Sequence, residues 1–209
     1  MNILVFGATG ATGQQLVKQA LSQGHAVTAF VRNPGALPRN EKHLRIVIGD
    51  TTRDTPKIVE AVSGQDVVIS ALGRRNSFKS DHLIERSMQA IVSSMERAGV
   101  RRLIVVSALG VGESRRDAPL IPRIMYRVLL SDIFADKKAA EDKVRSSNLD
   151  WTFVYPVLLT EGSMTGAYRV GERLELHGLP KISRSDVAHF ILTEIGNRTF
   201  VRKVAVISY

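Results

Sequence analysis

An apolar stretch, a glycine-rich loop, an amphipathic segment and a second apolar stretch follow one another at the start of the chain. Ile3–Phe6 is uniformly apolar, as expected for a strand covered on both faces. The loop Gly7–Gly13 leads into a segment, 12–23, whose apolar residues recur at helical spacing and which stops at Gly24. Ala26–Val31 is again strand-like. This order is typical of a βαβ unit, two parallel strands joined by a crossover helix.

The same alternation continues along the chain. We expect further strands at Leu44–Ile48, Asp66–Leu72, Leu103–Ser107, Trp151–Tyr155 and Val204–Ile207, and possible short strands at Ala167–Val170 and Leu174–Leu176. We expect helices that begin at the pair Thr55-Pro56, read as N-cap and first residue, at 81–98, near Pro122–Leu130, at Asp132–Ser146, and after a capping box, Ser183–Asp186. The pattern predicts a single α/β domain over 1–209, a Rossmann-type, doubly wound, mainly parallel sheet of roughly six to eight strands with helices on both faces.

Composition excludes several classes of protein. The chain has no cysteine, hence no disulfide framework and no thiolate metal site, and its five histidines lack metal-ligand spacing, so no metal is predicted. No apolar stretch is long enough to cross a membrane, and the start of the chain does not resemble a signal peptide, so we expect a cytoplasmic protein. The net charge of +9 fits attraction of phosphorylated ligands, whereas scattered basic pairs without interleaved aromatic residues make nucleic-acid binding unlikely.

The glycine loop has the spacing G-x-x-G-x-x-G rather than the commoner G-x-G-x-x-G. Taken alone, such a match could be a simple turn. Between a buried strand and a helix, however, glycines allow the backbone to approach a pyrophosphate, and the helix N-terminus offers free N–H groups and partial positive charge. The context therefore predicts a dinucleotide site.

The end of the second strand distinguishes between the two nicotinamide cofactors. An acidic residue there would bind the ribose hydroxyls of NAD, but this chain has Arg32, which suits the 2′-phosphate of NADP(H). Arg39 is a weaker candidate for that phosphate. Asp50, after the third strand, either borders the adenine or caps a turn. After the fourth strand, Gly73 would let the backbone pass the cofactor, and Arg75 could reach its phosphates. We predict NADP(H), with NAD(H) less favoured.

On these residues the chain resembles the atypical NAD(P)-binding branch of the short-chain dehydrogenase/reductases, in particular the biliverdin-IXβ reductase and flavin reductase family and its NmrA-like relatives. The motifs that carry the resemblance are GATGATG at 7–13, VRNP at 31–34, GD at 49–50, GQDVVISALGRRN at 64–76, Ser107, YPVLLTEGSMTGAYRV at 155–170 and ISRSDVAHF at 182–190. The resemblance implies a doubly wound sheet, a nicotinamide near the fifth strand and a substrate lying open above it.

Two departures from the wider superfamily bear on the reaction. The Tyr-x-x-x-Lys pair that usually protonates a carbonyl is missing, because Ile133 and Phe134 stand four residues before Lys137 and Lys138. The histidine that biliverdin-IXβ reductases carry two residues after the proline matching Pro156 is replaced by Leu158. Reduction of linear tetrapyrroles is therefore less favoured than reduction of flavins.

Ser107, at the end of the fifth strand, is the candidate catalytic residue, with a strand-end cap as the equal alternative. The predicted cofactor-binding residues are Gly7, Thr9, Gly10, Ala11, Thr12, Gly13, Arg32, Asp50, Ala71, Leu72, Gly73, Arg75, Ser107 and Pro156. The spacing of Lys137 and Glu141 predicts an ion pair on a helix surface. His189 is expected to be packed or solvated. Phe78, Met125 and Tyr126 could border a flat substrate, although packing is the default for each.

Three functions remain open at this point. The first is an NADPH-dependent reductase acting on a small planar acceptor such as free flavin, because such a reaction needs positioning more than acid–base groups. The second is a non-enzymatic NADP(H) sensor of the NmrA type, which the missing Tyr-x-x-x-Lys pair favours. The third, a sugar epimerase or dehydratase, is disfavoured by the short C-terminal region and the absent tyrosine. The sequence does not indicate the oligomeric state.

Overall fold

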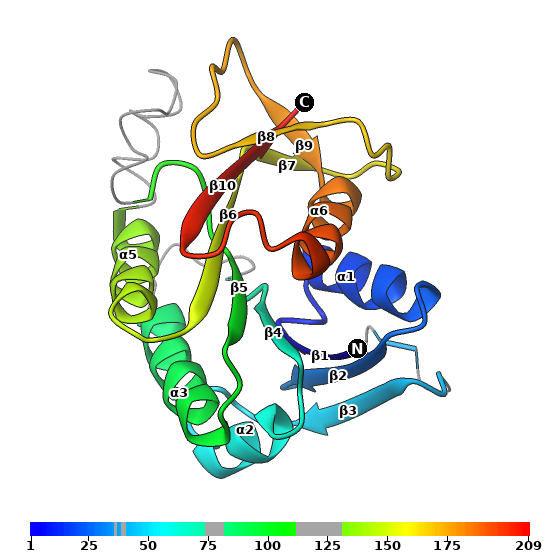
Figure 1. Cartoon of the computed structure of the whole chain (residues 1–209), viewed down its shortest axis with the longest axis vertical. Helices are drawn as coiled ribbons and strands as arrows, with labels where there is room; N and C mark the ends of the chain where they lie inside the picture. The colour runs from blue at the N-terminus through cyan, green and yellow to red at the C-terminus, as the bar shows by residue number, and fades with distance from the viewer. Residues whose placement is uncertain (36, 39–40, 74–81, 112–130) are drawn as a thin grey trace.

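The computed structural model describes residues 1–35, 37–38, 41–73, 82–111 and 131–209. In chain order the elements are β1 (Asn2–Phe6), α1 (Ala11–Ser22), β2 (Ala26–Val31), β3 (Leu44–Ile48), α2 (Thr55–Val62), β4 (Val67–Ser70), α3 (Leu83–Ala98), β5 (Arg102–Val106), α5 (Ser131–Arg145), β6 (Asp150–Pro156), β7 (Leu158–Thr160), β8 (Arg169–Gly171), β9 (Lys181–Ser183), α6 (Arg184–Asn197) and β10 (Lys203–Ser208). The strand–helix alternation that the sequence indicates is present throughout (Figure 1).

Within the described residues the main sheet has eight strands, in the order β3-β2-β1-β4-β5-β6-β10-β8. All neighbours in it are parallel except β10 and β8, which run antiparallel. From β1 the chain builds outward through β2 to β3, and it then returns to place β4 on the other side of β1. The connections leaving β1 and β4 therefore diverge, and in sheets of this topology ligands bind at the carboxyl edge beside that switch point. The predicted doubly wound fold is confirmed.

Helices cover both faces of the sheet. In Figure 1, α1 and α6 lie together on one side, while α3 and α5 lie on the other with α2 beside α3. All four residues of β4 are buried, as are four of the five in β1. The edge strand β3 has no fully buried residue. Burial on both faces explains why the central strands are continuous apolar runs rather than alternating ones.

The structure corrects several local predictions. Asp54 rather than Thr55 is the N-cap of α2, so the proline lies one residue further into the first turn than expected. Residues 174–176 are not a strand; Leu174 and Leu176 instead pack, partly buried, against the core. The short parallel pair of β7 and β9 was not predicted, because three-residue strands carry too little periodicity. The helix expected near Pro122–Leu130 lies outside the described residues.

Candidate functional site

Two glycines of the loop are required by the packing of the chain itself. Gly7 has φ +78°, and a Cβ there would lie 2.5 Å from the carbonyl oxygen of Ala71. A Cβ on Gly13 would lie 2.1 Å from the carbonyl oxygen of Gly7. Both distances are far inside van der Waals contact, so no side chain fits at either position. These glycines let β1, the first turn of α1 and the end of β4 converge at the carboxyl edge of the sheet.

Gly10 is less tightly enclosed than Gly7 and Gly13. It is the N-cap of α1, and a Cβ there would meet only the Gly7 carbonyl oxygen, at 3.3 Å. At Gly73 a Cβ would meet none of the described atoms within 4 Å. The α1 N-cap makes no side-chain hydrogen bond, and the first turn carries no acidic residue. The N-terminus of α1 therefore presents its N–H groups and partial positive charge without a capping side chain, and this turn is a cradle that fits a cofactor pyrophosphate.

The three other loop residues predicted to bind cofactor lie at this cradle. Thr9 is half-buried, and its carbonyl oxygen accepts a hydrogen bond from Nε2 of Gln14 at 2.9 Å, which steadies the turn. Ala11, the first helical residue, is exposed, whereas Thr12 is buried. The loop is thus tied to the first turn of α1 by the bond from Gln14 to Thr9.

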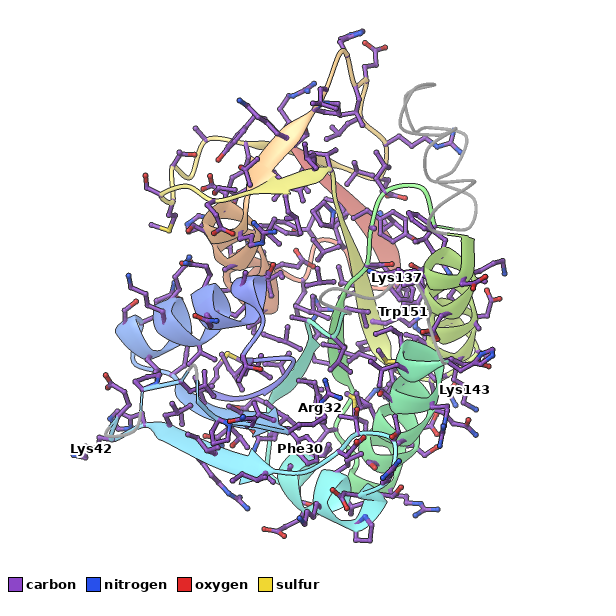
Figure 2. The ribbon with its side chains drawn as sticks, turned by 180° about the vertical axis from the view of Figure 1, so that it is seen from behind. Phe30, Arg32, Lys42, Lys137, Lys143 and Trp151 are labelled. Atoms are coloured by element: carbon purple, nitrogen blue, oxygen red, sulfur yellow. The ribbon has the colours of Figure 1, made fainter. Side chains whose placement is uncertain are left out.

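Arg32 and Asp50 lie close together at the ends of β2 and β3. The two strands pair through Val31 and Ile48, and Arg32 follows directly with an exposed side chain. Asp50 Oδ1 accepts hydrogen bonds from the N–H and hydroxyl of Thr52 at 2.8 and 2.7 Å. These bonds, with a smaller contribution from the Arg32 charge, lower the pKa of Asp50. The turn-cap role of Asp50 is thus present, and its contact with adenine stays a prediction. Figure 2 labels Arg32 beside Phe30 of β2.

The ends of β4, β5 and β6 complete the same edge of the sheet. The N–H of Ala71 donates to the carbonyl of Phe6 at 2.9 Å, which ties the end of β4 to β1. The N–H of Ser107 donates to the carbonyl of Val154, also at 2.9 Å. The carbonyl of Pro156 accepts from Leu109, at 3.3 Å. The structure therefore brings the glycine loop, Arg32, Asp50, Ala71, Leu72, Gly73, Ser107 and Pro156 to one edge of the sheet, whereas Arg75 lies outside the described residues.

Behind this edge Ser107 belongs to a buried hydrogen-bonded cluster. Its hydroxyl donates to Oε1 of Glu141 on α5, at 2.6 Å. The other carboxylate oxygen accepts from the hydroxyl of Tyr155 on β6, at 2.5 Å. Ser107, Glu141 and Tyr155 are only 6%, 4% and 2% exposed. The carboxyl of Glu141 thus joins α5 to the ends of two strands.

The surroundings of Glu141 perturb its protonation. Burial raises the pKa of its carboxyl, although the hydrogen bonds from Ser107 and Tyr155 and the charges of Arg145 and Lys137 oppose that rise. The Arg145 guanidinium stands 3.8 Å from the carboxylate. Burial also lowers the pKa of the Lys137 ammonium, against the attraction of Glu141 and Asp136. Desolvation and the neighbouring Glu141 raise the pKa of the Tyr155 phenol. Perturbed pKa values of this kind often mark functional sites.

Glu141 corrects the prediction of a helix-surface ion pair with Lys137. The carboxylate faces the sheet and binds Ser107 and Tyr155 rather than solvent. Figure 2 labels Lys137 on α5. A sequence signal was present, because Glu141 shares a helix face with the buried residues Ala140 and Val144. A carboxylate at a core-facing position needs a polar partner inside the protein, so the position of Glu141 favoured a buried hydrogen bond over an ion pair on the helix surface.

The other residues singled out in the sequence either have partners away from this edge or lie outside the described residues. His189 Nδ1 and the hydroxyl of Tyr168 are 2.7 Å apart, so this histidine is packed and hydrogen-bonded, as expected. Phe78, Met125 and Tyr126 lie outside the described residues, as does Arg39. Among the residues that the structure describes, no group of histidines and carboxylates could hold a metal ion. In the same part of the chain, no helix is both long and apolar enough to span a membrane.

Comparison with known proteins also indicates an NAD(P)H-binding protein. The model of a family described as NAD(P)H-binding matches residues 7–198. YwnB of Bacillus subtilis is 29% identical over 207 residues, covering 93% of this chain and 92% of its own.

Solved structures agree on the fold. The crystal structure of a Burkholderia pseudomallei protein shares 31% identity with full coverage of both chains and a TM-score of 0.82. ChuY, an anaerobilin reductase from Escherichia coli O157:H7, has a TM-score of 0.81 at 23% identity, with 99% and 96% of the two chains covered. A short-chain dehydrogenase/reductase of Veillonella parvula, solved with NADP, has a TM-score of 0.84 at 20% identity, with 100% and 94% covered. With its glycine cradle at the switch point of a doubly wound sheet, this chain belongs to the NAD(P)H-binding family.

Proposed function

We propose that the protein is an NADPH-dependent reductase that delivers hydride to a small planar acceptor, free flavin being the first candidate. The observation that carries the proposal is the carboxyl edge of the sheet. There the uncapped N-terminus of α1 at Gly10, the exposed guanidinium of Arg32 and the hydrogen-bonded Ser107 stand after the ends of β1, β2 and β5. A dinucleotide laid along this edge would place its pyrophosphate and its nicotinamide at different strands.

The preference for NADPH rests on Arg32. Its side chain is exposed, and among the described residues no carboxylate forms an ion pair with it within 4 Å. A guanidinium can donate two parallel hydrogen bonds to a phosphate. The α1 N-terminus would hold the pyrophosphate, Arg32 the 2′-phosphate, and Ser107 the nicotinamide carboxamide.

The chain's contribution to the reaction is positioning. Bound NADPH supplies the hydride, which is chemistry of the cofactor rather than of the protein. The turn at Gly7–Gly13 and the strand ends hold one flat ring against another, which is proximity catalysis. A flavin takes hydride at a ring nitrogen and can draw its proton from solvent, so a strong acid in direct contact is not required.

The test is NADPH oxidation by the purified protein against a panel of free flavins, quinones and linear tetrapyrroles, each corrected for the buffer rate. We expect reduction of at least one flavin, with NADPH preferred to NADH and no flavin bound in the purified protein. With a flavin as acceptor, Ser107→Ala should lower turnover modestly, by roughly tenfold or less, because it removes one orienting hydrogen bond. NADPH binding without any acceleration of acceptor reduction would contradict the proposal.

A non-enzymatic NADP(H) sensor is the second candidate. The observation in its favour is Ile133, which stands one turn before Lys137 in α5 and offers no phenol to protonate a carbonyl. Photosystem II assembly factor Ycf39 of Synechocystis, 26% identical over 175 residues, covering 81% of this chain and 48% of its own, bears a name that refers to assembly rather than reduction. A sensor would bind NADPH and fail the whole acceptor panel.

A further inference from the structure

The hydroxyl of Ser107 has a defined direction in this structure. With Glu141 ionised, it donates to Oε1 of that residue on α5, so its proton is engaged there. Only its lone pairs remain for a ligand, and in this state Ser107 can accept a hydrogen bond but cannot donate one. A nicotinamide carboxamide has an NH₂ group that matches such an acceptor. A substrate atom that must gain a proton does not match it.

The protonation state of Glu141 decides this direction. An ionised carboxylate can only accept, and it accepts from both Ser107 and Tyr155. If the oxygen facing Ser107 carries a proton, that oxygen donates, and the Ser107 hydroxyl is released toward the ligand. Tyr155 can keep its own bond in both states, because it donates to the opposite carboxylate oxygen. The geometry therefore permits both states without moving the backbone.

The charged groups around Glu141 are few within the described residues. Lys137 and Arg145 stand one turn before and one turn after it on α5. The neighbouring Asp136 is occupied elsewhere, because its carboxylate accepts the N–H groups of Ile84 and Glu85 at the start of α3. On that helix, the Glu85 carboxylate is paired with His82. Glu141 is thus a carboxyl in an enclosed, mostly apolar place, with two cations close enough to stabilise it after it loses a proton.

We propose that Glu141 is a positioning residue that stores a proton for Ser107, so that the pair takes the place of the missing acid in reductions that need a proton as well as hydride. The inference rests on the proposed reductase function and extends its range of acceptors. The acceptors that the Glu141–Ser107 pair would serve are planar and conjugated, such as quinones or conjugated imines, and must be protonated on oxygen or nitrogen. The direct observations are the 2.6 Å bond from Ser107 to Glu141 and the burial of both side chains.

The proton balance is complete. The acceptor would gain two bonds to hydrogen, one to the hydride that leaves the C–H bond of the reduced nicotinamide and one N–H or O–H bond to the proton of the Ser107 hydroxyl. The nicotinamide is oxidised and the acceptor reduced by the same two electrons. Ser107 takes the proton of Glu141 as its own leaves, which leaves a carboxylate held by Tyr155 and the nearby cations. Glu141 regains a proton from solvent after the product departs. No further oxidant or reductant takes part.

The first measurement is made on the cofactor-free protein with ¹³C-labelled glutamate carboxyl groups, followed by NMR as a function of pH. We expect one glutamate to titrate above the ordinary range and to vanish from the spectrum of Glu141→Gln. Its midpoint should rise further in Tyr155→Phe, by about one pH unit, because the phenol no longer stabilises the ionised form. The absence of any such glutamate would overturn the proposal, whether or not the protein is a reductase.

The second measurement is the pH profile of acceptor reduction. With a quinone, we expect kcat of Glu141→Gln to fall by about tenfold or more at neutral pH, with little change in KM for NADPH and a larger loss than with a flavin. Tyr155→Phe should move the alkaline limb of the profile upward together with the NMR midpoint. Asp142→Asn is the matched control, because Asp142 is exposed on the same helix and pairs with Lys138.

The outcomes separate the two proposals. A protein that reduces acceptors but shows the same pH profile and the same quinone-to-flavin ratio in Glu141→Gln would contradict the proton store and leave the reductase intact. A protein that reduces no acceptor contradicts the reductase, and the role of the pair in proton supply with it. A change in thermal stability alone, without a shift of the profile, would identify Glu141 as purely structural.

Discussion

At the scale of single residues, two side chains at the sheet edge act in opposite ways. Arg32 is exposed and available to an anion, whereas Glu141 is enclosed and already committed to Ser107 and Tyr155. An exposed cation without a protein partner is solvated by water at little cost in free energy, while a buried carboxyl must have partners inside the protein. Arg32 can therefore set which cofactor binds, and Glu141 can set how Ser107 presents its hydroxyl.

The first prediction concerns the choice of cofactor. Arg32→Gln should weaken NADPH binding by about 1.5–3 kcal/mol, at least tenfold, and leave NADH binding nearly unchanged, because it removes one charge-assisted contact to the 2′-phosphate. Titration calorimetry with both cofactors measures the difference. Arg53→Gln, another exposed arginine close to Asp50, serves as the control for the loss of general positive charge. Equal dissociation constants in the unaltered protein would rule out the assignment.

At the scale of elements, the turn between β1 and α1 uses its glycines for two purposes. Gly7 and Gly13 allow close packing of backbone against backbone, and Gly10 keeps the helix N-terminus free of a side chain. The first purpose belongs to folding and the second to binding. The three positions look alike in the sequence motif, and only the surrounding atoms tell them apart.

The second prediction exploits that difference. Gly13→Ala should lower the free energy of unfolding by about 1–3 kcal/mol, because its methyl group would overlap the carbonyl of Gly7. Gly10→Ala should keep the melting temperature within a few degrees yet weaken NADPH binding by about tenfold, because the methyl group occupies space meant for the pyrophosphate. Urea unfolding and cofactor titration of both variants provide the measurements. If Gly10→Ala bound NADPH as tightly as the parent, the cradle would lie elsewhere.

At the scale of the whole molecule, one carboxylate connects three distant segments. Asp186, in the first turn of α6, accepts the N–H groups of Thr165 and Gly166 at 2.8 and 2.9 Å and the hydroxyl of Tyr209 at 2.7 Å. Its own N–H donates to the N-cap Ser183 at 3.0 Å. The segment after β7, the start of α6 and the C-terminal residue are thereby held together. In Figure 1 these parts lie beyond the carboxyl edge of the sheet, next to β7 and β9.

The third prediction follows from the protonation of Asp186. Burial raises its pKa, but the hydrogen bonds from Tyr209, Gly166 and Thr165 outweigh burial and hold the pKa below its ordinary value of 3.8. A depressed folded-state pKa contributes stability that is present above the unfolded pKa and is lost as the pH falls through the folded one. Asp186→Asn should therefore lower the free energy of unfolding by about 1–3 kcal/mol at pH 7, and by much less at about pH 2.

Urea unfolding of both proteins at the two pH values checks this prediction. Glu161→Gln is a suitable control, because Glu161 is an exposed residue near the same segment that pairs with Arg184. Surface pairs of this kind contribute little to stability, so its effect should stay small at both pH values. An equal loss for Asp186→Asn at pH 7 and at about pH 2 would show that its hydrogen bonds do not depend on charge.

Local patterns of the sequence determined much of this protein. The strand–loop–helix order, the glycine spacing and the apolar runs predicted the doubly wound sheet, because backbone propensity and burial periodicity are properties of neighbouring residues. The same local patterns placed Arg32 and Ser107 at strand ends. The N-cap at Ser183 was also predicted, since its hydroxyl accepts the N–H of a residue only three positions away, at 3.0 Å.

Only the tertiary structure decided what these residues meet. Ser107, Glu141 and Tyr155 come from β5, α5 and β6, and no spacing in the sequence relates their hydrogen bonds. The antiparallel β8 and the reach of Asp186 to Tyr209 depend likewise on segments that fold back from a distance. A buried carboxyl must find partners, but which partners it finds depends on how helices pack on the sheet, and that packing is settled by contacts between residues far apart in the chain.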